Sequence, residues 1–485
     1  MSAAEILTVA EMTAADRRTI EAGTAGFALM QRAGEAVAAA IRQRWPACRC
    51  VVLCGPGANG GDGWVAARLL AAAGYDVSVA LEGEREALKG DAAEAARGWD
   101  GPLARLAPSA VTGAQLIVDA IFGAGLSRPV DSGVAETLRA AEASGAPIVA
   151  VDLPSGLSGD TGKPLGYAPR ATLTVTFHRR KVGHVLEPGR SLCGEVVVGD
   201  IGLIPAPVRL YENGPALWLH RFPWPTTTSH KHARGRLVVV SGEMTRTGAA
   251  RLAARAGLRI GAGLVTLLSP PDALAVNAAH LEAVMLKPFE TDAELEAAAD
   301  DADAAVIGPA AGVDDATVSN LLALVRTGAA IVIDADALTA FRDDPEELFS
   351  VLDRDDVLTP HPGEFDRVFP GLLKSAPERI TAARGAAARA HAVVLLKGPD
   401  TVIAAPDGRC AVNMNGVPWL ATAGSGDVLA GFLGGLMAQG MDSFDAACAG
   451  VWIHAEAAAL HGVGLTAEDL PGLAPAVLRQ LLSRR

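Results

Sequence analysis

Short apolar segments alternate with alanine-rich amphipathic stretches along most of this chain. A first series of apolar segments comprises residues 51–54, 77–81, 116–120, 148–151, 173–177 and 195–198. The stretches between them, such as residues 64–73 and 135–144, have the apolar spacing of helices. Strands and helices that alternate in this way predict an α/β fold with a mostly parallel, doubly wound sheet. In such sheets ligands bind beyond the carboxyl ends of the strands.

A second series of apolar segments follows an irregular stretch, residues 205–228, that is rich in Pro, Trp and Thr. It comprises residues 237–240, 264–268, 304–307, 331–333, 357–359, 393–396 and 402–405. A chain of 485 residues is too long for one ordinary core, so two domains of roughly 200–250 residues are expected. We place the boundary at Phe222, giving domains 1–222 and 223–485, and expect residues 12–44 to be helical.

Composition excludes several classes of protein. The net charge of −13 disfavours nucleic acid and anionic membrane as partners. Residues 1–11 lack the features of a signal peptide, and no run of about 18 apolar residues predicts a membrane span. The six cysteines have no usual zinc spacing. We therefore expect a cytoplasmic protein. A homo-oligomer is a separate expectation, and the sequence does not reveal the number of subunits. Lysine is scarce, and Lys181 and Lys397 both follow strand-like runs.

Two glycine–aspartate loops, one in each half, carry the chemistry. The first, residues 55–63, contains Asn-Gly-Gly-Asp-Gly after an apolar run, and the second, residues 423–427, contains Gly-Ser-Gly-Asp before a helix-like run. Glycines at a strand-to-helix junction let backbone N–H groups approach an anion, and the helix dipole adds to the attraction. An aspartate held in such a loop favours proton transfer or cation binding as a second role. The chain is therefore expected to hold two active sites.

Five polar residues of the first half fall at the expected strand ends, namely Asn59, Asp62, Asp119, Asp152 and Ser155. Their oxygen atoms form a ligand set that suits a hard cation and gives no reason for zinc. The alternative is that they are ordinary turn residues, since Asn, Asp and Ser are common in loops. Their convergence at one edge of the sheet favours a real site. Asp152 is the candidate acid/base.

These motifs, together with residues 11–34 and 151–156, resemble the NAD(P)H-hydrate epimerase domain over residues 8–215. The resemblance implies a Rossmann-like, three-layer fold and a potassium site at Asn59, Asp119 and Ser155. It implies substrate contacts at Ala58, Asn59, Gly60, Gly61, Asp62, Gly123, Ala124, Gly125, Leu126, Ser127, Arg128, Pro129 and Asp152. Ala58 departs from the family, which usually has Asn there, so altered substrate contacts are expected.

In the second half, the Gly424–Asp427 segment resembles the anion hole of ribokinase-like enzymes. With residues 247–250, 261–265, 359–364 and 396–401 it resembles the ADP-dependent NAD(P)H-hydrate dehydratase domain over residues 225–483. The resemblance implies a ribokinase-like α/β fold and ADP contacts at Lys397, Gly398, Pro399, Asp400, Thr401 and Gly426. Hydrate contacts are implied at Gly248, Gly312, His361 and Asp427. Ala310 and Ala311 replace the usual Gly-Leu, so loop contacts are expected to shift.

The two resemblances imply one function: repair of hydrated NADH and NADPH (NADHX and NADPHX). The first domain would interconvert the R and S hydrates, and the second would dehydrate the S form with ADP, giving NAD(P)H, AMP and phosphate. Asp427 would act as base, and Mg²⁺ would shield the phosphates. One alternative is a ribokinase-like small-molecule kinase with a fused ligand-binding domain; another is a non-catalytic nucleotide-binding module. The presence of both domains favours hydrate repair.

Overall fold

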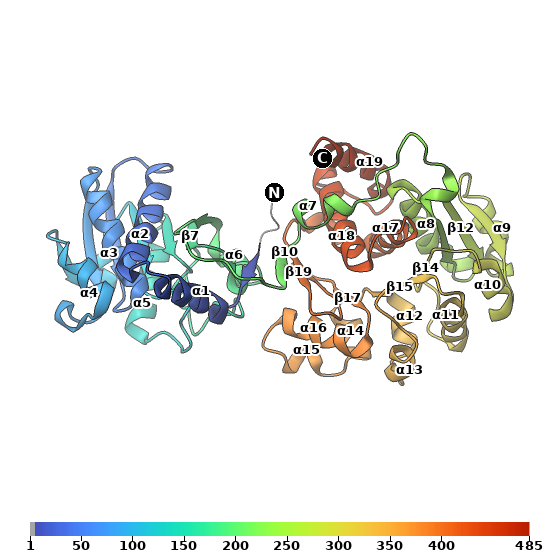
Figure 1. The fold of residues 1–485 in the computed structure, drawn as a ribbon, viewed down its shortest axis with the longest axis horizontal. Coiled ribbons are helices and arrows are strands. Elements are labelled where there is room, and N and C mark those ends of the chain that lie inside the picture. The colour runs from blue at the N-terminus through green and yellow to red at the C-terminus, as the bar shows by residue number, and fades with distance from the viewer. Residues whose placement is uncertain (1–4, 485) are drawn as a thin grey trace. The chain divides into compact units, whose positions relative to one another are not determined.

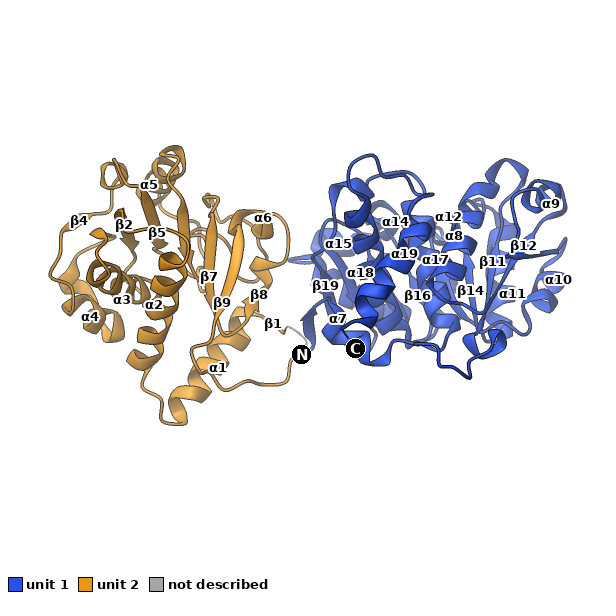
Figure 2. Ribbon diagram, turned by 90° about the horizontal axis from the view of Figure 1, so that it is seen from above, with its two compact units in different colours: residues 1–4, 209–485 blue, residues 5–208 orange. Residues whose placement is uncertain are grey.

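The computed structural model describes residues 5–484, which divide into two compact units, residues 5–208 and residues 209–484. Figure 2 colours the two units separately. The boundary expected at Phe222 lies inside the second unit. The cause is β10 (Leu210–Glu212), which pairs in parallel with β19 (Cys410–Asn413) and so ties this segment to the second sheet.

The first unit contains a seven-stranded sheet in which every neighbouring pair of strands is parallel. Its spatial order is β4 (Leu103–Arg105), β3 (Asp76–Leu81), β2 (Arg49–Cys54), β5 (Leu116–Ala120), β6 (Ile148–Val151), β7 (Leu173–Phe177) and β9 (Glu195–Gly199). Two short strands, β1 (Ile6–Leu7) and β8 (Arg180–Lys181), pair separately.

Helices cover both faces of this sheet, as the expected three-layer arrangement requires (Figure 1). Cys50 and Val52 of β2 pack with α2 (Gly26–Arg42), α3 (Ala58–Ala72) and α4 (Gly90–Arg97). Val51 and Leu53 point the other way and pack with α5 (Ser132–Ala143). Because successive side chains of a strand alternate between faces, a strand buried on both sides reads as a continuous apolar run. The remaining helices are α1 (Val9–Glu21) and α6 (Gly189–Cys193).

The second unit contains a ten-stranded sheet. Its spatial order is β10, β19, β18 (Thr401–Ala404), β17 (Val393–Leu396), β16 (Val357–Leu358), β15 (Ala330–Ile333), β14 (Ala304–Ile307), β11 (Arg236–Val240), β12 (Leu264–Ser269) and β13 (Met285–Pro288). Only the pairs that β18 makes with β17 and β19 are antiparallel among the described strands.

Helices again cover both faces of the second sheet (Figure 1). One face packs against α7 (Pro215–Trp218), α8 (Thr247–Ile260), α17 (Ser425–Ala438), α18 (Ser443–His461) and α19 (Leu470–Leu482). The other helices are α9 (Pro271–Ala278), α10 (Asp292–Ala299), α11 (Asp315–Thr327), α12 (Ala335–Ala340), α13 (Pro345–Phe349), α14 (Pro362–Val368), α15 (Leu372–Ser375) and α16 (Arg379–Ala390). A methyl group at Gly431 of α17 would lie 2.1 Å from the carbonyl oxygen of Ala253, so glycine lets α17 approach α8 closely.

The segment around β10 is anchored by side-chain amides. Asn213 Nδ2 donates to Asn413 Oδ1 at 2.9 Å and to the carbonyl oxygen of Cys448 at 2.8 Å. Trp218, which is fully buried, donates from its indole N–H to Asn213 Oδ1 at 3.2 Å. A buried polar group that has its hydrogen-bond partners stabilises one arrangement of the chain. These bonds therefore attach the start of the second unit to β19 and α18.

The expected fold class and every strand predicted from the apolar runs are confirmed, with two differences. Residues 12–44 form not one helix but two, α1 and α2, because Gly23 breaks the run with a φ of 103°. Six strands were not expected: β4, β10, β13, β19 and the short pair β1 and β8. Three of these lie at the edges of the two large sheets, where a strand buries little apolar surface, and β4 is exposed along its whole length.

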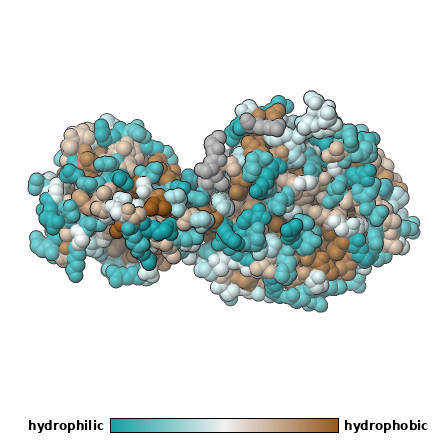
Figure 3. All heavy atoms as spheres, viewed as in Figure 1, coloured by the Kyte–Doolittle hydropathy of each residue, from teal (hydrophilic) through white to brown (hydrophobic). Residues whose placement is uncertain are grey.

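The face of the molecule seen in Figure 3 is mainly polar, with small apolar patches. Within residues 5–484, none of the helices combines the length and the apolar character needed to cross a membrane.

Candidate functional site

The first glycine loop runs directly into α3. The turn at residues 55–57 is followed by Ala58 as the first residue of the helix, so Asn-Gly-Gly-Asp forms the first turn of α3 and not a separate loop. A methyl group at Gly55 would lie 2.0 Å from the carbonyl oxygen of Ile121, and one at Gly60 would lie 1.9 Å from that of Gly55. Glycine is required here so that the start of the helix can lie directly against the strand ends.

Asp152 follows β6 and has a φ of 64°, a left-handed conformation that non-glycine residues rarely adopt. Its Oδ1 lies 2.7 Å from Lys181 Nζ and accepts a hydrogen bond of 2.9 Å from Thr176 Oγ1. Its Oδ2 accepts a hydrogen bond of 2.8 Å from the backbone N–H of Ala124. Both carboxylate oxygens are therefore held by donors from other strand ends.

Lys181 and His184 complete this cluster, and the sequence analysis assigned neither a role. Lys181 is 1% exposed, and its ammonium also donates to Thr176 Oγ1 at 2.7 Å. His184 Nδ1 accepts from the backbone N–H of Lys181 at 2.9 Å, so Nε2 carries the ring proton and donates to the carbonyl oxygen of Asp152 at 2.7 Å. Burial lowers the pKa of His184 to about 4, so the ring is neutral at pH 7.

A cavity of about 770 Å³ opens at this edge of the sheet. It brings together most of the substrate contacts implied by the sequence: Ala58, Asn59, Asp62, Gly123, Ala124, Gly125, Leu126, Ser127, Arg128 and Asp152. Lys181 and Asp16 line it as well. Gly60, Gly61 and Pro129 do not line it. Gly61 instead faces Met30, whose Sδ would lie 2.5 Å from a methyl group at that position.

The carboxyl groups of this cavity have opposite pKa shifts. Burial would raise the pKa of Asp152, but the Lys181 ammonium, His184 and the hydrogen bonds lower it to about 2. Burial and the charges of Asp152 and Asp16 raise the pKa of Asp62 well above its ordinary value. Burial also raises the pKa of Asp16. Carboxyl groups whose environments separate their pKa values in this way are suited to act as base and acid in one site.

The three expected potassium ligands lie at the same edge. Asp119 is fully buried, accepting at Oδ2 from Ser155 N–H at 2.8 Å and at Oδ1 from Ser155 Oγ at 2.6 Å. Burial raises the pKa of Asp119 to about 6, although the Ser155 hydrogen bonds lower it. Asn59 Nδ2 is shielded from solvent without a hydrogen-bond partner. The buried carboxyl group of Asp119 and the hydroxyl of Ser155 offer oxygen ligands of the kind a hard cation takes, whereas the unpaired Nδ2 of Asn59 is a donor and suits an acceptor atom of a ligand.

In the second unit, the Gly-Ser-Gly-Asp segment opens α17, which begins at Ser425. Gly424 has a φ of 83° and serves as the N-cap, so the backbone N–H groups of the first turn point out of the helix end. Asp427 lies in that turn. Burial and, next, the charge of Asp334 raise its pKa to about 6, while Lys397 lowers it. A carboxyl group near neutral pKa is suited to general-base catalysis.

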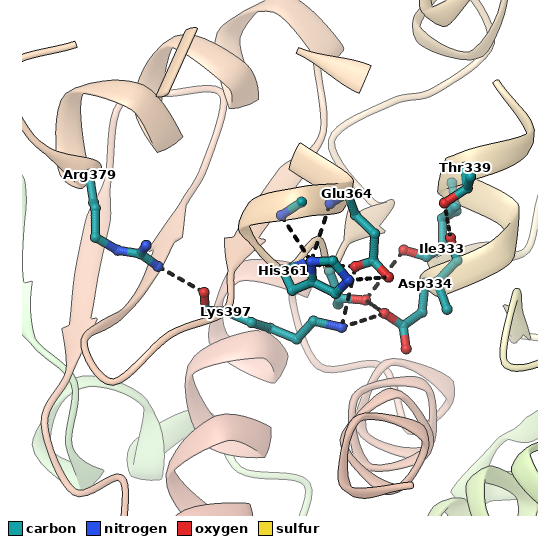
Figure 4. A network of polar contacts seen from close by, with 10 residues as sticks. Ile333, Asp334, Thr339, His361, Glu364, Arg379 and Lys397 are labelled. Carbon is teal, nitrogen blue, oxygen red and sulfur yellow. Dashed lines mark hydrogen bonds and ion pairs between the residues drawn. The ribbon is translucent and has the colours of Figure 1, made fainter. Parts of the chain in front are cut away.

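Lys397 lies between two carboxylates beside this helix end (Figure 4). Its Nζ is 2.8 Å from Asp334 Oδ1 and 3.7 Å from Glu364 Oε2. Asp334, which directly follows β15, also accepts from Thr359 Oγ1 at 2.7 Å. A methyl group at Gly426 would lie 3.7 Å from Lys397 Nζ, so the ammonium reaches the helix end. The sequence analysis missed Asp334, although its place after an apolar run is the signal that identified Asp119 and Asp152.

His361 caps α14. Its Nδ1 accepts from the N–H groups of Gly363 at 2.9 Å and Glu364 at 3.2 Å, and its Nε2 lies 3.2 Å from Glu364 Oε1. Its side chain is half exposed. The ring is thus held by the local helix start, with one edge open to a ligand.

Arg379 holds the turn that contains the expected ADP contacts (Figure 4). Its Nη2 donates to the carbonyl oxygens of Leu396 at 3.1 Å and Lys397 at 2.8 Å, and its Nε lies 3.1 Å from Asp400 Oδ1. Thr401 Oγ1 closes the turn by accepting from Gly398 N–H at 3.1 Å. The segment 397–401 is therefore a fixed turn at the same edge as Lys397 Nζ. The sequence analysis did not identify Arg379.

The loops after β11 and β14 contact each other; Gly312 lies in the second loop, and Gly248 lies in the first turn of α8. A methyl group at Gly242 would lie 2.0 Å from the carbonyl oxygen of Ala310. Gly312 has a φ of 98° and donates from its N–H to Asp336 Oδ2 at 3.0 Å. Ala310, where the resemblance leads one to expect glycine, has a φ of 55°. The backbone at residue 310 is therefore left-handed although the residue is alanine, and glycine would adopt this conformation with less strain.

Comparisons with known proteins match both halves of the chain. The family model described as "YjeF-related protein N-terminus" matches residues 26–183, and the model described as "NAD(P)H-hydrate dehydratase" matches residues 237–473. A curated protein of Coxiella burnetii, named bifunctional NAD(P)H-hydrate repair enzyme Nnr, is 36% identical, covering 91% of this chain and 92% of the relative. A protein of the same name from Moorella thermoacetica is 38% identical, covering 98% of this chain and 97% of the relative.

Among solved structures, a ribokinase-like superfamily protein from Enterococcus faecalis matches with a TM-score of 0.51 and 22% identity. The match covers 57% of this chain and 98% of that protein. It confirms the ribokinase-like fold expected for the second unit.

Replacing Ala310 with Gly is expected to raise the free energy of unfolding of the second unit by about 1 kcal/mol, since it relieves a left-handed alanine. Ala311, whose φ is not positive, provides the control. Ala311→Gly is expected to lower stability by roughly 0.5–1 kcal/mol through the added chain entropy. Calorimetry of the full chain measures both. An Ala310→Gly variant that is less stable than wild type would contradict the interpretation of strain.

Proposed function

Because the chain belongs to the family of bifunctional NAD(P)H-hydrate repair enzymes, we propose that it restores both epimers of hydrated NADH and NADPH to the reduced cofactor. The observation that carries this proposal is that each family-matched half holds its own polar cluster at the carboxyl ends of parallel strands. Asp152 and Lys181 lie in one, and Asp427 and Lys397 in the other. A cytoplasmic location and a homo-oligomeric state remain predictions from the sequence.

For epimerisation, a bond to C6 of the hydrated ring must break and re-form on the other face. Loss of the C6 hydroxyl proton, with protonation of the ring nitrogen, breaks the C6–N1 bond and leaves a carbonyl group at C6; closure on the opposite face gives the other epimer. An Asp152 carboxylate of pKa about 2 is a weak base on its own. We assign the proton transfers to Asp152 together with Lys181 and to Asp62, which lines the same cavity and whose pKa is raised by burial.

For dehydration, Asp427 would take the proton of the C6 hydroxyl as that oxygen attacks the β-phosphorus of ADP. The bond from phosphorus to the bridging oxygen breaks, and AMP leaves. The phosphate ester at C6 then leaves as phosphate with loss of the C5 proton, which restores the dihydronicotinamide. Lys397 and the N–H groups at the start of α17 are placed to stabilise the negative charge of the transferred phosphoryl group.

ADP is expected to enter with Mg²⁺, whose charge would offset that of the phosphates. Asp334 and Glu364 offer oxygen ligands of the kind that Mg²⁺ takes, and both lie beside Lys397. A small-molecule kinase would use the same base and helix end. The epimerase half favours hydrate repair, since interconversion of epimers serves a dehydratase that acts on one of them.

The intact chain is expected to convert a mixture of R and S hydrates completely to NADH when ADP and Mg²⁺ are present. The recovered absorbance of the dihydronicotinamide ring measures the yield. Repair of half of the mixture, completed on addition of a separate epimerase, would contradict the assignment of the first unit. A chain that repairs none of it, but phosphorylates an unrelated alcohol, would favour the kinase.

Asp427→Asn is expected to lower the rate of dehydration by about 10²–10⁴-fold, because the amide keeps the shape but cannot accept a proton. Interconversion of epimers should be unchanged. In the wild type the base must be ionised, so kcat/KM for dehydration should fall as the pH drops below about 6, the pKa of Asp427. A variant with wild-type activity, or a rate independent of pH between 5 and 7, would remove Asp427 from the mechanism.

We also propose that Asn59, Asp119 and Ser155 hold potassium. One buried carboxyl group among neutral oxygens suits a monovalent ion. Burial raises the pKa of Asp119, and the positive charge of a bound potassium ion would lower it again. The ion would organise the first turn of α3 and offset charge near the phosphates of the substrate.

Crystals soaked in a rubidium salt are expected to show an anomalous peak among these three residues. Asp119→Ala should abolish the peak and weaken epimerisation, while ADP-dependent dehydration of the pure S hydrate should be unchanged. Soaked wild-type crystals without a peak there would leave Asp119 with a structural role, in which its carboxylate holds the Ser155 loop.

A further inference from the structure

The first unit has the strand order of a fold that binds dinucleotides. From β4 to β7 the spatial order is β4-β3-β2-β5-β6-β7. The strands β3 and β4 therefore lie on one side of β2, and β5, β6 and β7 lie on the other. In such sheets a dinucleotide lies across the point where the order reverses, with its pyrophosphate at the N-terminus of the helix that follows the first strand. Here that point lies between β2 and β5, and the helix is α3.

The turn between β2 and α3 has the matching glycine spacing. Gly55, Gly57 and Gly60 form the pattern Gly-x-Gly-x-x-Gly. The pattern directly follows a strand and enters a helix, and in that position it indicates dinucleotide binding. Gly55 and Gly60 both lie where a methyl group would collide with backbone.

The positions of the candidate proton-transfer groups indicate which end of a bound dinucleotide lies on which side of β2. Asp152 directly follows β6, and Lys181 ends β8 and bonds to Thr176 of β7; both lie on the β5 side of the reversal, so the hydrated nicotinamide belongs on that side. With the pyrophosphate at the start of α3, the adenosine half extends toward the end of β3.

Glu82 lies at that end. It directly follows β3, about twenty residues beyond Gly60, and its backbone N–H donates to the carbonyl oxygen of Cys54 at 2.9 Å. Its side chain is half-buried, and its Oε2 has no hydrogen-bond donor. Two charged side chains act on it: Asp131 and Arg128, the latter lining the cavity. The half-buried carboxylate of Glu82 therefore lies at the strand end where the ribose of a dinucleotide is bound in this kind of sheet.

We propose that Glu82 accepts a hydrogen bond from the 2′-hydroxyl of the adenosine ribose and thereby makes the epimerase site select NADH hydrate over NADPH hydrate. This inference rests on the proposed epimerase function of the first unit. The 2′-phosphate of NADPH hydrate would place negative charge close to the carboxylates of Glu82 and Asp131. Arg128 would offset only part of that repulsion, so NADPH hydrate would bind more weakly than NADH hydrate.

The test measures interconversion of R and S hydrates in the absence of ADP, so that dehydration does not contribute. Wild type is expected to have a kcat/KM for NADH hydrate about tenfold or more above that for NADPH hydrate. Glu82→Gln should reduce this ratio to near one, through KM and with kcat little changed. Glu84→Gln, in the exposed part of the same loop, is the matched control and should keep the wild-type ratio.

A second measurement does not depend on the variant's folding. In the same assay with wild type, ADP-ribose should inhibit competitively at a concentration about tenfold lower than 2′-phospho-ADP-ribose. Equal inhibition by the two compounds, or a ratio unchanged in Glu82→Gln, would overturn the role of Glu82 and leave the epimerase function standing. Absence of interconversion with either hydrate would overturn the epimerase function and this inference together.

Discussion

In each unit, a lysine ammonium is held against a carboxylate and largely away from water, and the surrounding polar groups are arranged around that pair. Lys181 lies 2.7 Å from Asp152, and Lys397 lies 2.8 Å from Asp334. Removing such charges from water is costly, so each pair persists only because further hydrogen bonds satisfy both partners. Thr176 bonds to both members of the first pair, and Thr359 bonds to the carboxylate of the second.

The same kind of pair has opposite effects on the neighbouring chemistry. In the first unit Asp152 belongs to the pair, so its pKa is low, whereas burial and the charges of Asp152 and Asp16 raise the pKa of Asp62. In the second unit the carboxylate nearest the helix end stands outside the pair. Burial, and the negative charge that Asp334 brings, raise the pKa of Asp427 toward neutrality. The lysine pair thus lowers the pKa of the candidate acid/base in the first unit, and in the second unit the pair's carboxylate helps to raise the pKa of the candidate base.

Most of the fold and part of the sites could be predicted from sequence because the signal was local. A strand buried on both faces is a continuous apolar run, and an aspartate at its end marks the functional edge, as for Asp119 and Asp152. Lys181, Thr176 and His184 could not be found in this way, because they reach Asp152 from later strands and turns whose register only the folded sheet fixes. Arg379 likewise acts through backbone carbonyl oxygens, which leave no pattern in the sequence.

The pairing of β10 with β19 bears on how the two halves can be separated. The matched dehydratase segment begins at residue 237, yet the sheet of the second unit takes its outermost strand from residues 210–212. A fragment cut at the family boundary would leave β19 with unpaired backbone N–H and C=O groups along one side, which invites pairing between copies of the fragment. It would also leave Asn413 without the amide of Asn213. An excised dehydratase therefore has to begin before Arg209 if it is to stay monodisperse.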